Sequence, residues 1–305
     1  MEFPVNEVRK IDEELDKYFT DIARNGNPLD YFSRFVVPEL EGAEDVKKAL
    51  LLMLVSDDEN ETTEARKRIH IGLVGEPGTG KTVIMRALER DFGAKYLTQD
   101  TTKSSLKGDA RKKTYGIQIF KKYHKGIISF DEVELFDDRE TLRDVMENGW
   151  VQIDKGGGEE KYPARIRIIA GSNTFKKLSP ALLDRLDFIF DFKVPTPEES
   201  KRIARKVLAI YAGRMFKEEI YKIQQYLKWI GDFSPALLEE EEHKIGELFD
   251  NYFDLIGEGR TGRWISKAIR IAFAHAKLRK DDVRVMDVKV ALKMLNNNKK
   301  KKEGK

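Results

Sequence analysis

Residues 75–82 read Gly75-Glu76-Pro77-Gly78-Thr79-Gly80-Lys81-Thr82 and match the pattern G-x-x-x-x-G-K-[ST]. An apolar run at residues 69–74 precedes this stretch, and a run with helical spacing at residues 82–88 follows it. A strand, a glycine-rich loop and a helix in this order bring backbone N–H groups and the positive end of a helix to one point, where phosphate groups bind. The whole eight-residue loop is therefore predicted to hold the phosphates of ATP.

Two adjacent acids, Asp131 and Glu132, follow the apolar strand pattern of residues 126–130. We expect Asp131 and the Thr82 hydroxyl to hold Mg²⁺, Glu132 to polarise the attacking water, and Lys81 to reach the β- and γ-phosphates. The alternative is that the two acids only cap the next helix, because Asp and Glu favour helix starts. The predicted cofactors are ATP and Mg²⁺.

The chain up to residue 194 alternates β-rich runs with helical patterns, after an amphipathic helix predicted over residues 5–22 and another over 44–54. This order is typical of a parallel sheet covered on both faces. We therefore predict an α/β fold, an αβα sandwich, over residues 1–194. The expected strands are 69–74, 95–98, 126–130, 166–171 and 188–192, and the helices between them start near 80, 116, 139 and 180.

Beyond residue 195 the sequence shows only helical patterns, so we predict an all-α lid domain over residues 195–296. Its helices are expected at 198–213, 217–230, 235–256, 262–279 and 286–295. Residues 297–305 are basic and low in complexity, and are predicted to be disordered.

Composition excludes several kinds of protein. The 305 residues include no cysteine, so disulfides and thiolate chemistry are excluded, and the four histidines are scattered. The longest apolar run, residues 49–55, is far shorter than the ~20 residues of a membrane span. No signal peptide is visible, and we expect a cytoplasmic enzyme without a membrane partner.

Positive charge gathers in residues 101–125, which hold eight Lys or Arg and one acid, although the net charge of the whole chain is only +3. A solvated helix face with a loop explains this pattern, and so does a surface that faces a polyanion. Nearby, residues 150–154 and 164–169 alternate around the glycine-rich stretch 155–158, which predicts a β-hairpin. Lys155 lies at its expected tip, where a lysine taken alone is most often only solvated.

The order of these motifs resembles the AAA+ class, and within it the minichromosome maintenance (MCM) replicative helicases. The residues that carry the resemblance are Val37-Pro-Glu-Leu-Glu-Gly-Ala-Glu-Asp-Val-Lys-Lys-Ala-Leu50, Leu178-Ser-Pro-Ala-Leu-Leu-Asp-Arg-Leu-Asp-Phe-Ile-Phe190 and Ile265-Ser-Lys-Ala-Ile-Arg-Ile-Ala-Phe-Ala-His-Ala-Lys-Leu-Arg279. The likeness covers residues 5–296. It does not extend to the family's N-terminal DNA-binding portion or its winged helix, so we expect a motor core.

The resemblance implies further roles. Asn173 is similar to the sensor-1 residue that orients water and γ-phosphate, and Arg185 to the arginine finger offered to a neighbouring subunit's nucleotide. Arg263 resembles the sensor-2 arginine that binds nucleotide, with Arg260 as a near competitor. A finger that works in trans implies a ring, six subunits by resemblance. Lys155 would grip single-stranded DNA in the central channel.

Two departures from the family concern the DNA-facing parts and the loop. Residues 98–116 are shorter than the family's second-helix insertion. The phosphate loop at residues 75–82 has the form that is general to AAA+ proteins. We therefore expect an ATP-dependent DNA helicase or translocase motor. An AAA+ ATPase that remodels or loads proteins, and is not stimulated by DNA, is the alternative. A non-hydrolysing subunit of a mixed ring is a third reading, which nothing in the sequence favours.

Overall fold

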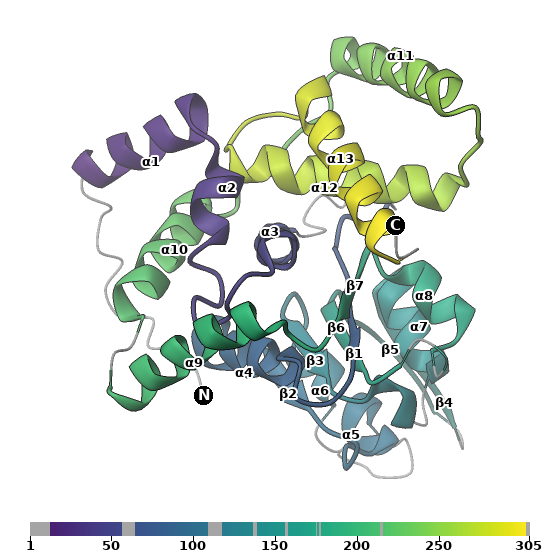
Figure 1. The fold of residues 1–305 in the computed structure, drawn as a ribbon. Helices are drawn as coiled ribbons and strands as arrows, with labels where there is room; N and C mark the ends of the chain where they lie inside the picture. Colours follow the sequence, from purple (N-terminus) through teal and green to yellow (C-terminus); the bar gives the residue numbers. More distant parts are fainter. Residues whose placement is uncertain are drawn as a thin grey trace.

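Five strands form one parallel sheet in the order β2-β3-β6-β1-β7, flanked by helices (Figure 1). The structure, a computed structural model, describes residues 13–56, 65–108, 118–136, 139–155, 158–174, 176, 178–213 and 216–302. The sheet strands are β1 Ile71–Gly75, β2 Lys95–Leu97, β3 Ile127–Phe130, β6 Arg167–Ser172 and β7 Phe188–Phe192. This α/β fold, with helices alone in its C-terminal part, confirms the predicted fold class.

The helices before and between the strands are α1 Glu13–Asn25, α2 Pro28–Ser33, α3 Glu44–Val55, α4 Lys81–Phe92, α5 Lys103–Lys107, α6 Ile119–Lys122, the short 3-10 helix η1 Val133–Leu135, α7 Arg139–Asn148 and α8 Pro180–Arg185. Those after the sheet are α9 Pro197–Tyr211, α10 Lys217–Ile230, α11 Glu239–Ile256, α12 Gly262–Leu278 and α13 Val285–Lys302. The first helix, predicted over residues 5–22, is described from Glu13, because residues 1–12 lie outside the described part.

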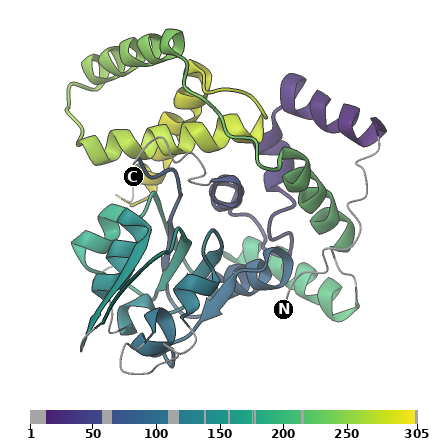
Figure 2. The ribbon, with the colours of Figure 1, turned by 180° about the vertical axis from the view of Figure 1, so that it is seen from behind.

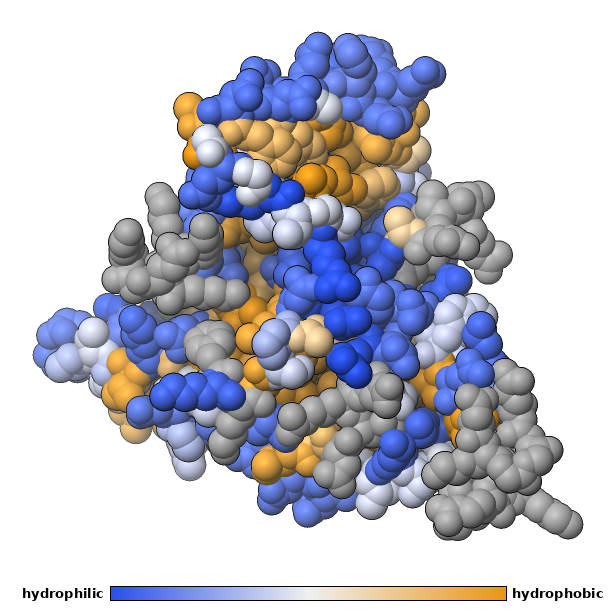
Figure 3. Space-filling view, turned by 90° about the vertical axis from the view of Figure 1, so that its right-hand side faces the viewer, coloured by the Kyte–Doolittle hydropathy of each residue, from blue (hydrophilic) through white to orange (hydrophobic). Residues whose placement is uncertain are grey.

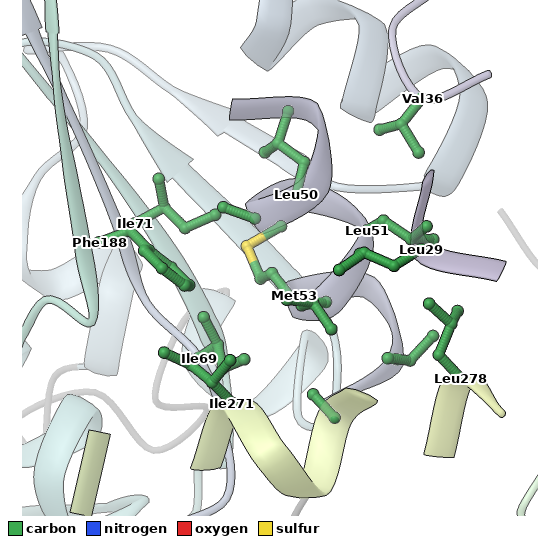
Figure 4. Packing of buried hydrophobic residues seen from close by; sticks show 14 of the residues in the cluster. Leu29, Val36, Leu50, Leu51, Met53, Ile69, Ile71, Phe188, Ile271 and Leu278 are labelled. Atoms are coloured by element: carbon green, nitrogen blue, oxygen red, sulfur yellow. The ribbon is translucent and has the colours of Figure 1, made fainter. Parts of the chain in front are cut away.

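Helix α3 occupies the centre of the molecule because its residues 49–55 are apolar on every side. Leu50, Leu51 and Met53 are fully buried, and they lie between sheet residues such as Ile71 and the helix α12 (Figure 4). A helix that is hydrophobic all round needs partners on all faces. The helices before and after the sheet therefore share one core through α3. The view from behind shows α3 end-on in the middle of the ribbon (Figure 2). The domain boundary near residue 195 stays a prediction.

The β-hairpin is present, but the predicted second arm was wrong. Strand β4 Trp150–Lys155 pairs with β5 Gly158–Pro163, in antiparallel register from Trp150↔Pro163 to Lys155↔Gly158. Residues 164–166 lead on to β6, which belongs to the central sheet. The alternation after Ala164 fits either a hairpin arm or a buried strand, and the parallel pairing of β6 with β1 and β3 decides between them.

Two helix boundaries in the C-terminal part also differ from the prediction. Helix α11 begins at Glu239, not at residue 235, because Ala236 pairs through its backbone with Asp282 and Val283. Helix α13 continues through Lys302, so the prediction of disorder from residue 297 was wrong as far as that residue. Asn298 holds this last part in place, since its amide donates to Ile189 O (2.9 Å) and accepts from Ile189 N (3.2 Å) on strand β7.

Candidate active site

The glycine-rich loop joins β1 to α4 in a shape that only glycine permits at its ends. Gly75 has φ +153°, and a Cβ there would lie 2.2 Å from Phe192 O. Gly80 has φ +101° and precedes the first residue of α4, Lys81. The first N–H groups of a helix have no acceptor within it, so those of α4 are available to phosphate oxygens, as a phosphate-binding loop requires.

Lys81 is buried within this loop. Its Nζ donates to Gly75 O (2.5 Å) and Glu76 O (2.9 Å). Burial lowers the pKa of Lys81, and the nearby carboxylates, Asp131 first, oppose that shift. The ammonium group is thus aimed across the loop, where it can exchange a carbonyl partner for a phosphate oxygen.

Asp131 follows β3 and faces the start of α4. Its Oδ2 accepts hydrogen bonds from Thr82 Oγ1 (3.1 Å) and from the Tyr96 hydroxyl (2.7 Å). Burial and then the bond to Asp131 raise the pKa of Tyr96 to about 12, so the phenol keeps its proton and donates. A hydroxyl and a carboxylate beside a phosphate loop are oxygen ligands of the kind Mg²⁺ prefers, so these residues fit the predicted metal.

Glu132 and Asn173 meet at the ends of neighbouring strands β3 and β6. Asn173 Nδ2 donates to Glu132 Oε1 (2.9 Å). The backbone of Glu132 has φ +55°, a strained conformation for a residue with a side chain. Strain of this kind persists where surrounding contacts hold it, and here it turns the carboxylate toward the amide that resembles sensor 1.

These groups line one pocket of about 490 Å³ at the carboxyl ends of the strands. The lining residues are Pro77, Gly78, Gly80, Lys81, Thr82, Val83, Tyr96, Thr98, Gln99, Asp100, Asp131, Glu132 and Asn173. Sequence analysis did not single out Tyr96 or residues 98–100. The signal that could have found them is their position after β2, whose carboxyl end meets the same edge as that of β3.

Arg185 and Arg263 lie together on another face. Arg185 donates to Ala181 O (2.8 Å) and pairs with Glu147 (3.3 Å), while Arg263 pairs with Asp184, the neighbour of Arg185. Within the part of the chain that the structure describes, neither arginine lines the pocket. The prediction that Arg263 binds nucleotide therefore does not fit its own subunit's pocket. Arg260, the competitor, pairs with Glu258.

A buried carboxylate missed by sequence analysis, Asp187, supports this second face. Its oxygens accept from Arg270 of α12 (2.7 Å), from Arg66 (3.3 Å) and from the backbone N of His70 (2.8 Å). Arg66 also donates to Arg185 O (3.3 Å). Burial would raise the pKa of Asp187, but Arg270 and Arg66 outweigh it and lower the pKa to about 2.

Arg66 and Arg270 also line a second pocket, of about 690 Å³, between α12 and the segments at residues 65–67 and 235–237. This cavity is larger than the first. It contains neither the phosphate loop nor the two acids, so its size does not make it the nucleotide site.

The basic segment packs against the hairpin. Lys121 of α6 pairs with Glu160 of β5 (3.0 Å), and the Tyr162 hydroxyl donates to Lys107 O (2.9 Å). In Figure 1 the hairpin and α5 lie at the same lower end of the molecule. Lys155 ends β4, but its side chain and residues 109–117 lie outside what the structure describes.

A phosphate loop, two acids and a strand-end amide on a five-stranded parallel sheet define a nucleotide-binding P-loop protein of the AAA+ class. The MCM P-loop domain family matches residues 16–211, and this chain belongs to that family.

Relatives with MCM names are similar along most of the chain. An uncharacterized MCM-type protein of Methanocaldococcus jannaschii is 28% identical over 90% of this chain and 46% of its own length. The minichromosome maintenance protein MCM of Saccharolobus solfataricus is 27% identical over 88% of this chain and 44% of its own. DNA replication licensing factor MCM4 of Drosophila melanogaster is 25% identical over 90% and 36%. The chain thus spans less than half the length of these relatives.

No helix in the described ranges is long and apolar enough to cross a membrane.

Proposed function

We propose that this chain is an ATP-hydrolysing motor of MCM type that works in a ring with DNA in its central channel. The observation that carries the proposal is the convergence of Lys81, Thr82, Asp131, Glu132 and Asn173 on one pocket. These five side chains come from two strand ends and one helix start. A nucleotide-binding protein without hydrolysis needs the loop lysine, but it has no need of Glu132 hydrogen-bonded to Asn173.

Each side chain has a distinct task in hydrolysis. Lys81 and the N–H groups of the loop would bind the phosphate oxygens, and Mg²⁺ held by Thr82 and Asp131 would neutralise their charge. Glu132 is the carboxylate placed to accept a proton from the attacking water, since it lines the same pocket. Asn173 fixes the direction of that carboxylate through its amide (2.9 Å).

The second face supports assembly into a ring. Negative charge develops as the γ-phosphoryl group of ATP is transferred. An arginine finger supplies the positive charge that stabilises it. Arg185 and Arg263 do not line their own pocket, and Arg263 is paired with Asp184 beside Arg185 in sequence, which supports a role toward the nucleotide of a neighbouring copy. Figure 3 shows the side that carries α7 and α8, where a hydrophilic strip crosses the middle of the face. Six copies follow from the family resemblance.

DNA as the channel substrate rests on the hairpin, the basic segment and the relatives. The hairpin packs against α5 and α6, so the backbone of Lys155 and the lysines of these two helices belong to one end of the molecule. Positive charge in this arrangement suits a phosphate backbone and predicts salt-sensitive binding. One relative is named a DNA replication licensing factor.

An ATPase assay tests the proposal. We expect hydrolysis that requires Mg²⁺ and rises with single-stranded DNA, with less stimulation as salt increases. The Lys81→Ala variant, purified in the same way, measures contaminating activity. Hydrolysis that DNA leaves unchanged at every salt concentration would contradict the DNA motor and favour a protein-remodelling ATPase. Absence of hydrolysis above the Lys81→Ala background would contradict the enzyme.

A further inference from the structure

The Tyr96 hydroxyl is bonded to the carboxylate that would hold the metal. Tyr96 lies on the edge strand β2 and donates to Asp131 Oδ2 over 2.7 Å, a shorter contact than the 3.1 Å from Thr82. Two donors on one oxygen fix the orientation of the Asp131 side chain. The backbone of Asp131 is fixed separately, because its N donates to Leu97 O (2.9 Å).

The ring of Tyr96 is itself held in place. The guanidinium of Arg86 lies over it, 3.7 Å from the ring centroid, and Arg86 also pairs with Glu89 (2.9 Å). Arg86 and Thr82 lie on the same helix, α4, one turn apart. A hydrogen bond from a clamped ring orients its acceptor more strongly than one from a mobile side chain, because less freedom is left to lose.

We propose that Tyr96 is a positioning residue, which sets the Asp131 carboxylate for binding Mg²⁺ in the nucleotide complex. The inference rests on the proposed function, and it adds a residue that acts on the metal through Asp131. The partners that orient metal ligands commonly contribute ~10–100-fold to metal affinity. Tyr96 lines the same pocket, and its hydroxyl donates to Asp131.

The test is binding of a fluorescent ATP analogue to Tyr96→Phe, measured by anisotropy across a Mg²⁺ series and in EDTA. Phenylalanine keeps the ring under Arg86 and removes only the hydroxyl. We expect the half-saturating Mg²⁺ concentration to rise about 10-fold, while affinity in EDTA stays within about twofold of wild type, because the phosphate loop is unchanged.

Tyr252→Phe is the matched control. It also removes one tyrosine bond between side chains, to Asn296 (2.9 Å), but on α11, far along the chain from the pocket. It should bind the analogue as wild type does at every Mg²⁺ concentration. The melting temperature without nucleotide should fall by a similar amount in the two variants, because each loses one hydrogen bond.

An unchanged Mg²⁺ requirement in Tyr96→Phe would overturn the inference. So would an equal loss of affinity with Mg²⁺ and in EDTA, because the hydroxyl would then act on the loop or on folding. Failure of the proposed function looks different. In that case wild-type protein itself shows no Mg²⁺-dependent binding of the analogue.

Discussion

The pocket at the strand ends and the face formed by α8 and α12 both have a part in the proposed hydrolysis, but they are built in opposite ways. In the pocket, Lys81, Asp131, Glu132 and Asn173 point at one space, and each follows a strand of the same sheet or opens a helix beside it. On the other face, Arg185 and Arg263 are held by acids of their own chain, Glu147 and Asp184. The pocket residues surround one space within their own subunit, whereas the two arginines do not line that space.

This difference teaches how catalysis can be divided between copies. In the proposed function, nucleotide binding needs only the pocket, and turnover needs both groups. A substitution in the pocket should therefore affect each subunit by itself. A substitution on the α8 and α12 face should be rescued by a neighbour that supplies the missing arginine.

Lys81→Ala should have the largest effect. Loss of the ammonium that is directed by Gly75 and Glu76 should weaken ATP binding by about 100-fold or more, close to 3 kcal/mol, and abolish turnover. Titration with a fluorescent ATP analogue measures it. Lys244→Ala, on the exposed face of α11, is the control. Tight binding by Lys81→Ala would mean that the loop is not the phosphate site.

Arg185→Ala should lower the turnover number by ~10³ or more, the range of an arginine finger, with little change in nucleotide affinity. Mixing it with Lys81→Ala subunits should restore part of the ATPase activity, because each kind supplies what the other lacks. Arg284→Ala, an exposed ion-paired arginine at the start of α13, is the control. If Arg185→Ala hydrolyses ATP normally, the two faces do not share the reaction.

Glu132→Gln should bind ATP normally and turn it over ~10²-fold more slowly, the range of general base catalysis. The glutamine can still accept the hydrogen bond from Asn173, so the pocket keeps its shape. Steady-state ATPase rates and binding of the analogue separate the two effects. Glu247→Gln, at an exposed position on α11, is the control and should behave as wild type. A strong loss of binding would show that Glu132 is a structural residue.

The stability of the folded protein should depend on pH through Asp187, which lies at the second face. Its pKa falls from an ordinary 3.8 to about 2 in the folded protein, so its stabilisation is present above pH 4 and is lost as pH falls toward 2. This contributes about 2 kcal/mol. As pH falls from 5 to 2.5, the melting temperature of the wild type should approach that of Asp187→Asn. Asp30→Asn, at a half-exposed pair with Lys48, is the control. A constant gap between wild type and Asp187→Asn would contradict the assignment.

Lys155→Ala should have the smallest effect, a few-fold loss of single-stranded DNA affinity at moderate salt with unchanged basal hydrolysis. Removing one phosphate contact should also reduce the salt slope by about one. Anisotropy of labelled DNA across a salt series measures both. Lys176→Ala, an exposed lysine elsewhere, should bind as wild type. Unchanged affinity and slope in Lys155→Ala would remove the hairpin from the DNA interface.

Much of the pocket could be predicted because its signals are local. A glycine pattern between an apolar run and a helical run indicates the loop, and acids directly after an apolar run indicate the end of a strand. The hairpin shows the limit of this reasoning. Both Gly158–Pro163 and residues 164–169 could have been the second arm, and only pairing with distant strands separates them.

The sequence by itself determined the parallel α/β sheet and predicted the phosphate loop with Lys81, Asp131 and Glu132, because each depends on neighbours along the chain. The role of Asn173 came from the family resemblance. Only the tertiary structure decided that Tyr96 donates to Asp131, that Arg263 pairs with Asp184 away from the pocket, and that Asp187 is buried against Arg270. Those arrangements depend on contacts between residues 35 to 121 positions apart, and local patterns carry no record of such pairings.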